Sequence, residues 1–252
     1  MNIPYTAHIS AVFFSSFAAM AHHGCLINMT KEITAITPQK RNAQRLNISL
    51  DGEYAFSLDR MTAAWLNVGR KLSPQEIEKL REKDEQEVAY NRAMHYLSYR
   101  ARSEDEMLTY LSGKGFSEIV SQTVIDRLKD EHLISDARFA EDWIENRVSF
   151  RPRSQTQLRF ELRQKGLQED IIENALQDAN LDDIKLALAA GTKLARRYAG
   201  LTWLNFRQKL SAALARRGFS YETARTVTQQ LWDETQKQNT ARDHSWSTDN
   251  NV

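Results

Sequence analysis

Eleven arginine and lysine residues in the second half of the sequence could bind an anionic partner through ionic contacts. Guanidinium and ammonium groups pair with phosphates and carboxylates, and Arg159 and Arg163, four residues apart, would share one helix face. Trp143, Tyr198, Trp203 and Phe206 lie among them and could stack on bases, although aromatic residues at helical spacing more often form a core. The candidate binding residues are Arg147, Arg151, Arg153, Arg159, Arg163, Lys165, Arg196, Arg197, Arg207, Arg216 and Arg217.

Catalytic and metal-binding patterns are absent from the sequence. It contains no phosphate-binding glycine loop, no G-x-S-x-G and no H-E-x-x-H motif. His95 and His132 stand alone, and Asp182-Asp183 lies where it would cap a helix. The one cysteine, Cys25, permits neither an intrachain disulfide nor a cysteine-rich zinc site. We therefore predict a binding protein rather than an enzyme, with no catalytic residue, cofactor or metal.

The net charge of +1 hides an uneven distribution along the chain. Residues 72–145 contain 10 Lys and Arg against 17 Asp and Glu, whereas residues 147–217 contain 14 against 7. A run of charge is often only a solvated helix face. The swing from acidic to basic residues nevertheless favours a binding surface in the second part of the chain.

Three glycine turns indicate the helices on which these basic side chains would lie. Lys114-Gly115-Phe116, Lys165-Gly166-Leu167 and Arg217-Gly218-Phe219 recur at steps of 51 and 52 residues. Apolar residues one helical turn apart precede each glycine, which can take the left-handed conformation that ends a helix. The aligned apolar residues are Leu111, Leu162 and Leu214 four before the glycine, Met107, Leu158 and Leu210 eight before it, and Val124, Ala175 and Val227 nine after it.

Serines mark where the helices of this repeated unit begin. Ser103 with Glu106, and Ser154 with Gln157, predict capping boxes at equivalent positions. We therefore predict a mainly α fold of tandem three-helix repeats that form an elongated curved array. The predicted repeats span residues 100–149, 150–202 and, in truncated form, 203–232.

A β-rich region is predicted before the repeats, over residues 30–70. Asp51-Gly52 lies between two stretches of alternating apolar residues, which is the strongest short-range sign of a hairpin. Ser73-Pro74-Gln75-Glu76 then predicts the capped start of a connecting helix over residues 72–99. A small N-terminal hairpin or sheet should therefore precede the helical array.

The two ends of the chain carry no comparable pattern. Residues 1–28 are predicted to be a disordered extension; the alternative is a signal peptide with its apolar core at Ala11–Ala21, but residues 1–10 contain no Lys or Arg. Residues 233–252 are polar and are predicted to be a disordered tail. No stretch reaches the ~20 apolar residues that cross a bilayer, so we expect no membrane contact. The single cysteine fits a reducing compartment, and we expect a monomer in the cytoplasm.

Several short motifs, taken in order, resemble the bacterial RecX family of regulatory proteins. They are Arg100-x-Arg102-Ser103, the turn from Leu111 to Lys114-Gly115-Phe116, the segment from Leu133 to Ala140, and Arg151-x-Arg153-Ser154 followed by Glu161-Leu162 and Lys165-Gly166. Gln39-Lys40-Arg41 before the hairpin is similar to longer family members. The resemblance covers roughly residues 30–232. Ser135, where the family often has Asp or Asn, departs from the pattern but keeps the capping chemistry.

The resemblance implies a partner and an activity. Members of this family bind the RecA recombinase, chiefly as a filament on single-stranded DNA, and depress its ATP hydrolysis, strand exchange and co-protease activity. They thereby tune recombinational DNA repair and the SOS response. RecA would be the partner of this chain, and single-stranded DNA would be contacted directly or through RecA.

Two other functions fit the same residues. Tight glycine turns and Arg-rich helix entries would also serve a tandem helix-turn-helix-like protein that reads duplex DNA. A helical-repeat adaptor without DNA contact is the second alternative. Sequence-selective binding of duplex DNA in the absence of RecA would favour the first of these.

Overall fold

A small antiparallel sheet begins the part of the chain that the computed structural model describes, which is residues 29–249, with side chains placed from 29 to 238. The predicted hairpin turn is present: Asp51 and Gly52 have φ angles of 51° and 91°, the positive values that a type I′ turn requires. One face of the sheet buries Ile33, Ile48 and Leu58 completely. The strand order is β3-β2-β1-β4, with bounds β1 Lys31–Pro38, β2 Arg45–Leu50, β3 Glu53–Asp59 and β4 Lys71–Leu72.

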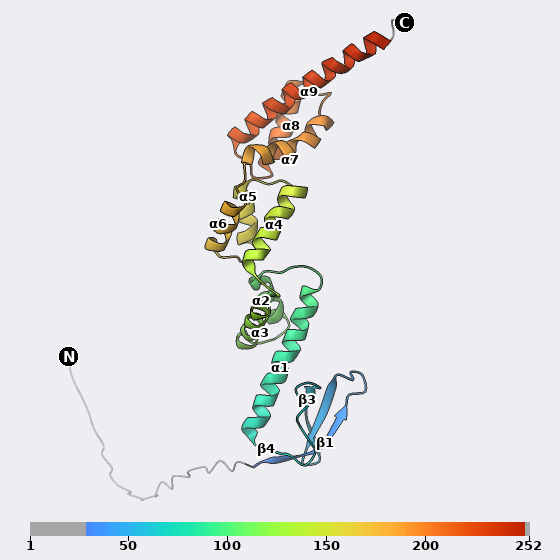
Figure 1. Ribbon diagram of the computed structural model, residues 1–252, viewed down its shortest axis with the longest axis vertical. Helices are drawn as coiled ribbons and strands as arrows, with labels where there is room; N and C mark the ends of the chain where they lie inside the picture. The colour runs from blue at the N-terminus through green and yellow to red at the C-terminus, as the bar shows by residue number, and fades with distance from the viewer. Residues whose placement is uncertain (1–28, 250–252) are drawn as a thin grey trace, which may run out of the picture.

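The helix α1 (Pro74–Leu97) leads from the sheet into the helical array (Figure 1). Ser73 and Glu76 form both halves of the predicted capping box at its start. Leu80, near this end, packs into the core of the sheet. Ala89, further along, is fully buried among residues of the next two helices. The helix is therefore more than a connection, because its second half belongs to the first helical unit.

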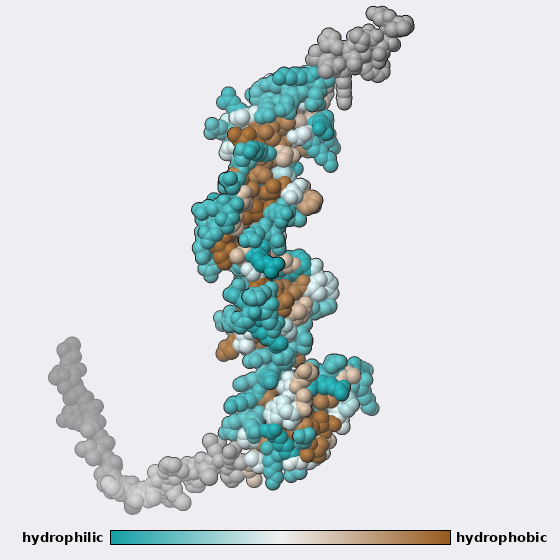
Figure 2. All heavy atoms as spheres, viewed as in Figure 1, coloured by the Kyte–Doolittle hydropathy of each residue, from teal (hydrophilic) through white to brown (hydrophobic). Residues whose placement is uncertain are grey.

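The helices between Pro74 and Asp249 form three units that follow one another along an elongated array (Figure 1). Each unit has its own buried cluster of apolar residues. On the face seen in Figure 2, apolar residues emerge as successive patches bordered by polar ones. The first unit contains the second half of α1 with α2 (Glu104–Gly113) and α3 (Glu118–Asp130), the second contains α4 (Asp136–Phe150), α5 (Gln155–Arg163) and α6 (Glu169–Asp178), and the third contains α7 (Asp183–Arg197), α8 (Trp203–Ala215) and α9 (Tyr221–Asp249).

The aligned residues occupy equivalent places in the three units. Gly115, Gly166 and Gly218 have φ angles of 89°, 78° and 86°, so each takes the left-handed conformation that ends the middle helix. The residues four and eight positions before each glycine are all fully buried. The predicted mainly α fold, with a helical unit used three times after a small sheet, is confirmed.

The predicted boundaries between repeats, after residues 149 and 202, differ from the packing by one helix. Phe139 of α4 shares a core with α5 and α6, rather than ending the unit before. Leu186 of α7 likewise shares a core with α8 and α9, so the third unit is not truncated. The aligned glycines fix the step between equivalent turns. That step is the same wherever a unit is taken to begin, so it could not locate the boundaries.

The predicted disordered tail, residues 233–252, is helical as far as α9 extends. Side chains four residues apart bridge its turns, with Gln229 donating to Asp233 at 2.9 Å and Gln230 to Glu234 at 3.0 Å. Such local pairs leave no apolar periodicity, which is why the pattern missed the helix. The extension predicted at residues 1–28, with its signal-peptide alternative, lies outside the described residues. Within residues 29–249 no helix is long and apolar enough to cross a membrane.

Candidate basic interaction surface

Most of the predicted binding cations in the second unit are engaged in ion pairs within the protein. The nitrogen-to-oxygen distances are 2.7 Å for Arg147–Glu161, 3.5 Å for Arg153–Glu161, 2.5 Å for Arg159–Glu173 and 2.6 Å for Arg163–Glu169. The hydrogen bond between Arg163 and Glu169 raises the pKa of the guanidinium and lowers the pKa of the carboxyl. These cations therefore offer little uncompensated charge to a partner.

Lys165 belongs to the junction between the first two units. Its ammonium lies 2.6 Å from the carboxylate of Glu106, which Arg100 also contacts at 2.9 Å. Burial raises the pKa of Glu106, but hydrogen bonds from Arg100 and Lys165 outweigh this effect and the pKa is lowered. The predicted capping box is thus half formed: the Ser103 hydroxyl accepts from the Glu106 amide, whereas the Glu106 carboxylate binds the two cations.

The serines that cap helices also join one unit to the next. The hydroxyl of Ser103 donates to the carbonyl of Lys165 at 2.6 Å, and the amide of Ser154 donates to the carbonyl of Arg217 at 3.1 Å. Both serines are fully buried. Each carbonyl belongs to the residue before an aligned glycine, so the two junctions use equivalent positions, although the donor is a hydroxyl in one and a backbone amide in the other.

Aspartates complete both junctions. Asp182 caps α7 as predicted, with its carboxylate accepting from two backbone amides. Asp183 accepts from the amide of Gln155 in the preceding unit at 3.0 Å. Asp136 accepts equivalently from the amide of Glu104 at 2.9 Å, and burial raises its pKa. The first residue of each later unit therefore binds a helix N-terminus of the unit before it, where a carboxylate is favourable.

Most of the predicted cations of the third unit face solvent without carboxylate partners. Arg196, Arg197, Arg207 and Arg216, here called the third-unit cations, are exposed. None of them takes part in an ion pair among the described side chains. Eight Lys and Arg residues, and no Asp or Glu, lie in residues 184–221. The third unit thus carries a local excess of positive charge that the protein itself does not neutralise.

Arg217 and Arg151 complete the predicted set. Arg217 is partly buried and donates to the carbonyl of Ala190 at 2.7 Å, and burial lowers its pKa. It ties the end of α8 to α7, which is a structural role. Arg151 is exposed beyond the end of α4 and forms no ion pair with residues 29–238. Of the eleven candidates, only Arg151 and the third-unit cations remain available to a partner.

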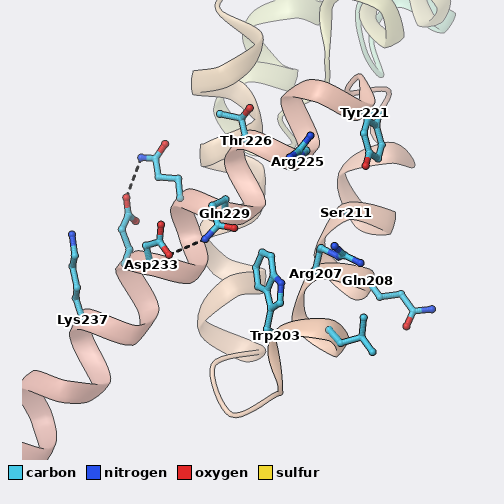
Figure 3. Close-up of a pocket in the computed structure, with 13 residues that line it drawn as sticks. Trp203, Arg207, Gln208, Ser211, Tyr221, Arg225, Thr226, Gln229, Asp233 and Lys237 are labelled. Carbon is cyan, nitrogen blue, oxygen red and sulfur yellow. Dashed lines mark hydrogen bonds between the residues drawn. The ribbon is translucent and has the colours of Figure 1, made fainter.

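A groove of about 1300 Å³ lies between α8 and α9 in the same unit. Trp203 and Arg207 line it from α8, and Tyr221 and Arg225 line it from α9 (Figure 3). Trp203 also packs against Trp232, with ring centroids 5.4 Å apart, so it is both a core residue and part of the groove. Tyr221 and Arg225 are not among the residues predicted from the sequence. Residues 184–221 contain no Asp or Glu, and this run, which ends at Tyr221, could have indicated them.

Four family models match the chain in order. The Regulatory protein RecX N-terminal domain matches residues 31–73, and the first, second and third RecX three-helix domains match residues 89–128, 135–176 and 182–228. These three matches begin within α1, just before α4 and just before α7. They therefore agree with the grouping of helices that the packing gives.

Similar proteins and structures carry the same name. Regulatory protein RecX of Bacillus subtilis is 33% identical over 202 residues, which cover 79% of this chain and 76% of that protein. The RecX protein of Lactobacillus johnsonii is 33% identical over 202 residues, covering 79% and 74%. A crystal structure of regulatory protein RecX has a TM-score of 0.61 and 28% identity, covering 79% of this chain and 99% of that one. RecX from Lactobacillus salivarius has a TM-score of 0.51 and 28% identity, covering 59% and 97%.

The resemblance seen in the sequence is thereby confirmed, as is the prediction of a non-enzymatic protein. The matched segments run from the sheet to α9 in a single order and include every helical unit. With four consecutive domain matches and relatives alike over most of their length, the chain belongs to the RecX family of regulatory proteins.

Proposed function

We propose that this protein binds RecA assembled on single-stranded DNA and restrains its ATP hydrolysis, strand exchange and co-protease activity. It would thereby tune recombinational repair and the SOS response. The observation that carries the proposal is the complete, ordered set of four RecX domain matches, because this family modulates RecA. The protein would act as a monomer in the cytoplasm, where RecA works.

The elongated array suits a partner that is itself a long polymer. Units joined end to end can contact several RecA protomers, and linked weak contacts gain from a high effective concentration. The third-unit cations would face DNA phosphates or an acidic RecA surface. The acidic first part of the chain, with 17 Asp and Glu against 10 Lys and Arg in residues 72–145, would face a basic RecA surface. Occupation of the filament groove would hinder duplex entry.

The direct test measures ATP hydrolysis by the cognate RecA on single-stranded DNA, with and without this protein. We expect the hydrolysis rate to fall as the protein is added. An unchanged rate at a several-fold molar excess would overturn the proposal.

A matched pair of double variants tests the part that charge plays. Arg196→Gln/Arg197→Gln removes two exposed cations of the third unit, and Lys79→Gln/Lys83→Gln removes two exposed cations from α1. We expect the first variant to inhibit RecA less and with a weaker dependence on salt, because fewer counterions are released on binding. The second should inhibit like the wild type. Equal inhibition by the two variants would exclude a special role for the third-unit cations.

Arginines of the second unit are poor choices for such a test. Reversal of Arg159 or Arg163 would place a carboxylate beside Glu169 or Glu173 and disturb the second unit itself. A loss of inhibition would then report on folding as well as on binding.

Duplex DNA without RecA separates the proposal from its alternatives. A mobility-shift assay should show no tight, sequence-selective duplex binding. Such binding would favour the helix-turn-helix-like alternative. RecA inhibition without any dependence on the third-unit cations would instead fit an adaptor that does not touch DNA.

A further inference from the structure

The groove between α8 and α9 combines two exposed apolar side chains with unpaired cations. Tyr221 is 82% exposed and Leu204 is 63% exposed, so neither contributes much to the core. Both line the groove, with Trp203 beside them. An exposed tyrosine in the first turn of a helix has no evident structural role, because its ring packs on little and helix starts do not require aromatic residues. A ligand with flat, apolar faces would use it.

Two arginines supply positive charge at the same place. Arg207 of α8 and Arg225 of α9 are exposed, and the ion pairs formed within residues 29–238 include neither. The guanidinium of Arg207 lies 6.0 Å from the ring centroid of Trp203, so a cation and an aromatic face adjoin. Figure 3 shows Arg207 and Arg225 extending into the space between the two helices.

The remaining groove residues are polar, and their charges distinguish the two ends of the groove. Gln208, Ser211 and Thr226 can donate and accept hydrogen bonds, as base edges and sugars require. Asp233 and Glu234 lie further along α9, where they accept hydrogen bonds from Gln229 and Gln230. These two carboxylates outnumber the one cation at that end, Lys237, so an anionic backbone fits the end at Tyr221, Arg207 and Arg225 better.

We propose that this groove binds one strand of nucleic acid directly, with bases stacked on Tyr221 and Trp203 and phosphates held by Arg207 and Arg225. This binding would be part of the proposed function, and it rests on that function because RecA assembled on single-stranded DNA would bring the strand to the third unit. Stacking platforms combined with a basic groove are the means by which proteins bind single strands without sequence preference. A duplex hides its base faces, and an acidic protein helix would need a longer apolar stripe than Leu204 and Trp203 provide.

The test uses the full chain and fluorescein-labelled oligo(dT), with binding followed by fluorescence anisotropy in the absence of RecA. Tyr221→Ala should weaken binding by roughly 5-fold to 100-fold, the usual cost of removing one stacking platform. Arg225→Gln should also weaken it and should lower the slope of log K against log salt by about 0.7, the value for one phosphate contact on a single strand.

Two matched variants serve as controls. Tyr99→Ala removes a tyrosine that is 70% exposed, but in the first unit, and Arg138→Gln removes an exposed arginine of α4. Both should bind oligo(dT) like the wild type. Because all four side chains are exposed, each variant should keep the wild-type circular dichroism spectrum and melting temperature.

The outcomes separate this inference from the proposed function. Unchanged oligo(dT) binding by Tyr221→Ala and Arg225→Gln would overturn the inference, even if both variants still inhibit RecA. Weaker RecA inhibition by these variants with unchanged oligo(dT) binding would also overturn it, since the groove would then hold a protein segment. Oligo(dT) binding that depends on Tyr221 and Arg225, in a protein that does not inhibit RecA, would support the inference and refute the proposed function.

Discussion

Replacement of Gly166 by alanine should weaken the junction between the first two units, beyond the ordinary cost of a left-handed alanine. Gly166 has a φ of 78°, and an added Cβ would lie 2.2 Å from the Cβ of Asp105 in α2. Gly115 offers a matched control, because its φ is 89° and an added Cβ would meet nothing within 4 Å. Both variants incur the left-handed cost of about 1–2 kcal/mol. Only Gly166→Ala must also push the two units apart.

The additional cost can be worked out from the contacts that the push would break. The hydrogen bond from Ser103 to the Lys165 carbonyl, at 2.6 Å, contributes about 1 kcal/mol net. The ion pair of Lys165 with Glu106 adds up to about 1 kcal/mol, since both side chains are partly exposed. We therefore expect Gly166→Ala to lower the free energy of unfolding by roughly 2–4 kcal/mol, against about 1–2 kcal/mol for Gly115→Ala.

Urea denaturation followed by circular dichroism measures this difference. The stability of a repeat array is the sum of unit and interface terms, so Gly166→Ala should also make unfolding of the first unit less cooperative with the rest. Asp105→Gly removes the Cβ that causes the overlap and should partly restore the stability of Gly166→Ala. Equal losses of stability in Gly166→Ala and Gly115→Ala, or no coupling between Asp105→Gly and Gly166→Ala, would show that the overlap with Asp105 does not weaken the junction.

Three further variants test the core, the caps and the acid response. Leu162→Ala, at a fully buried position, should cost about 2–5 kcal/mol in urea unfolding; a loss below about 1 kcal/mol would contradict the assigned core. Ser103→Ala should cost about 1–3 kcal/mol, because it removes both a helix cap and the bond to the Lys165 carbonyl; retention of wild-type stability would exclude the junction bond. The folded-state pKa of Glu106 lies below its ordinary value of 4.5, so its ion pairs stabilise the protein above that pH and are lost as pH falls through the folded pKa. Melting temperatures measured from pH 7 to pH 3 should therefore fall further for the wild type than for Glu106→Gln, and parallel curves would contradict this.

Local rules were enough to predict much of the fold. Backbone signals that act within a few residues can be predicted from the sequence. Examples are the Asp51-Gly52 turn, a capping serine and a left-handed glycine. The repeat step of 51 or 52 residues needed only alignment on Gly115, Gly166 and Gly218. The chain alone therefore determined the hairpin, the helix starts and the threefold use of one unit.

Only the tertiary structure decided which cations are available for binding. Arg147 lies 14 residues from Glu161, and Lys165 lies 59 residues from Glu106, yet each pair is in contact. A composition count treats these cations as equal to Arg196, although each of them already pairs with a carboxylate within the protein.

The boundaries of the units and the close approach of Gly166 to Asp105 also depend on the tertiary structure. The unit into which α4 or α7 packs depends on which apolar faces meet in the folded protein. The repeat step gives only the spacing of equivalent turns and no information about this packing. The turn at Gly166 ends a helix by local chemistry, but its closeness to Asp105 exists only because two units meet there. Short-range backbone preferences can thus be predicted from the sequence, whereas the pairing of distant charges and of apolar helix faces is established only when the chain folds.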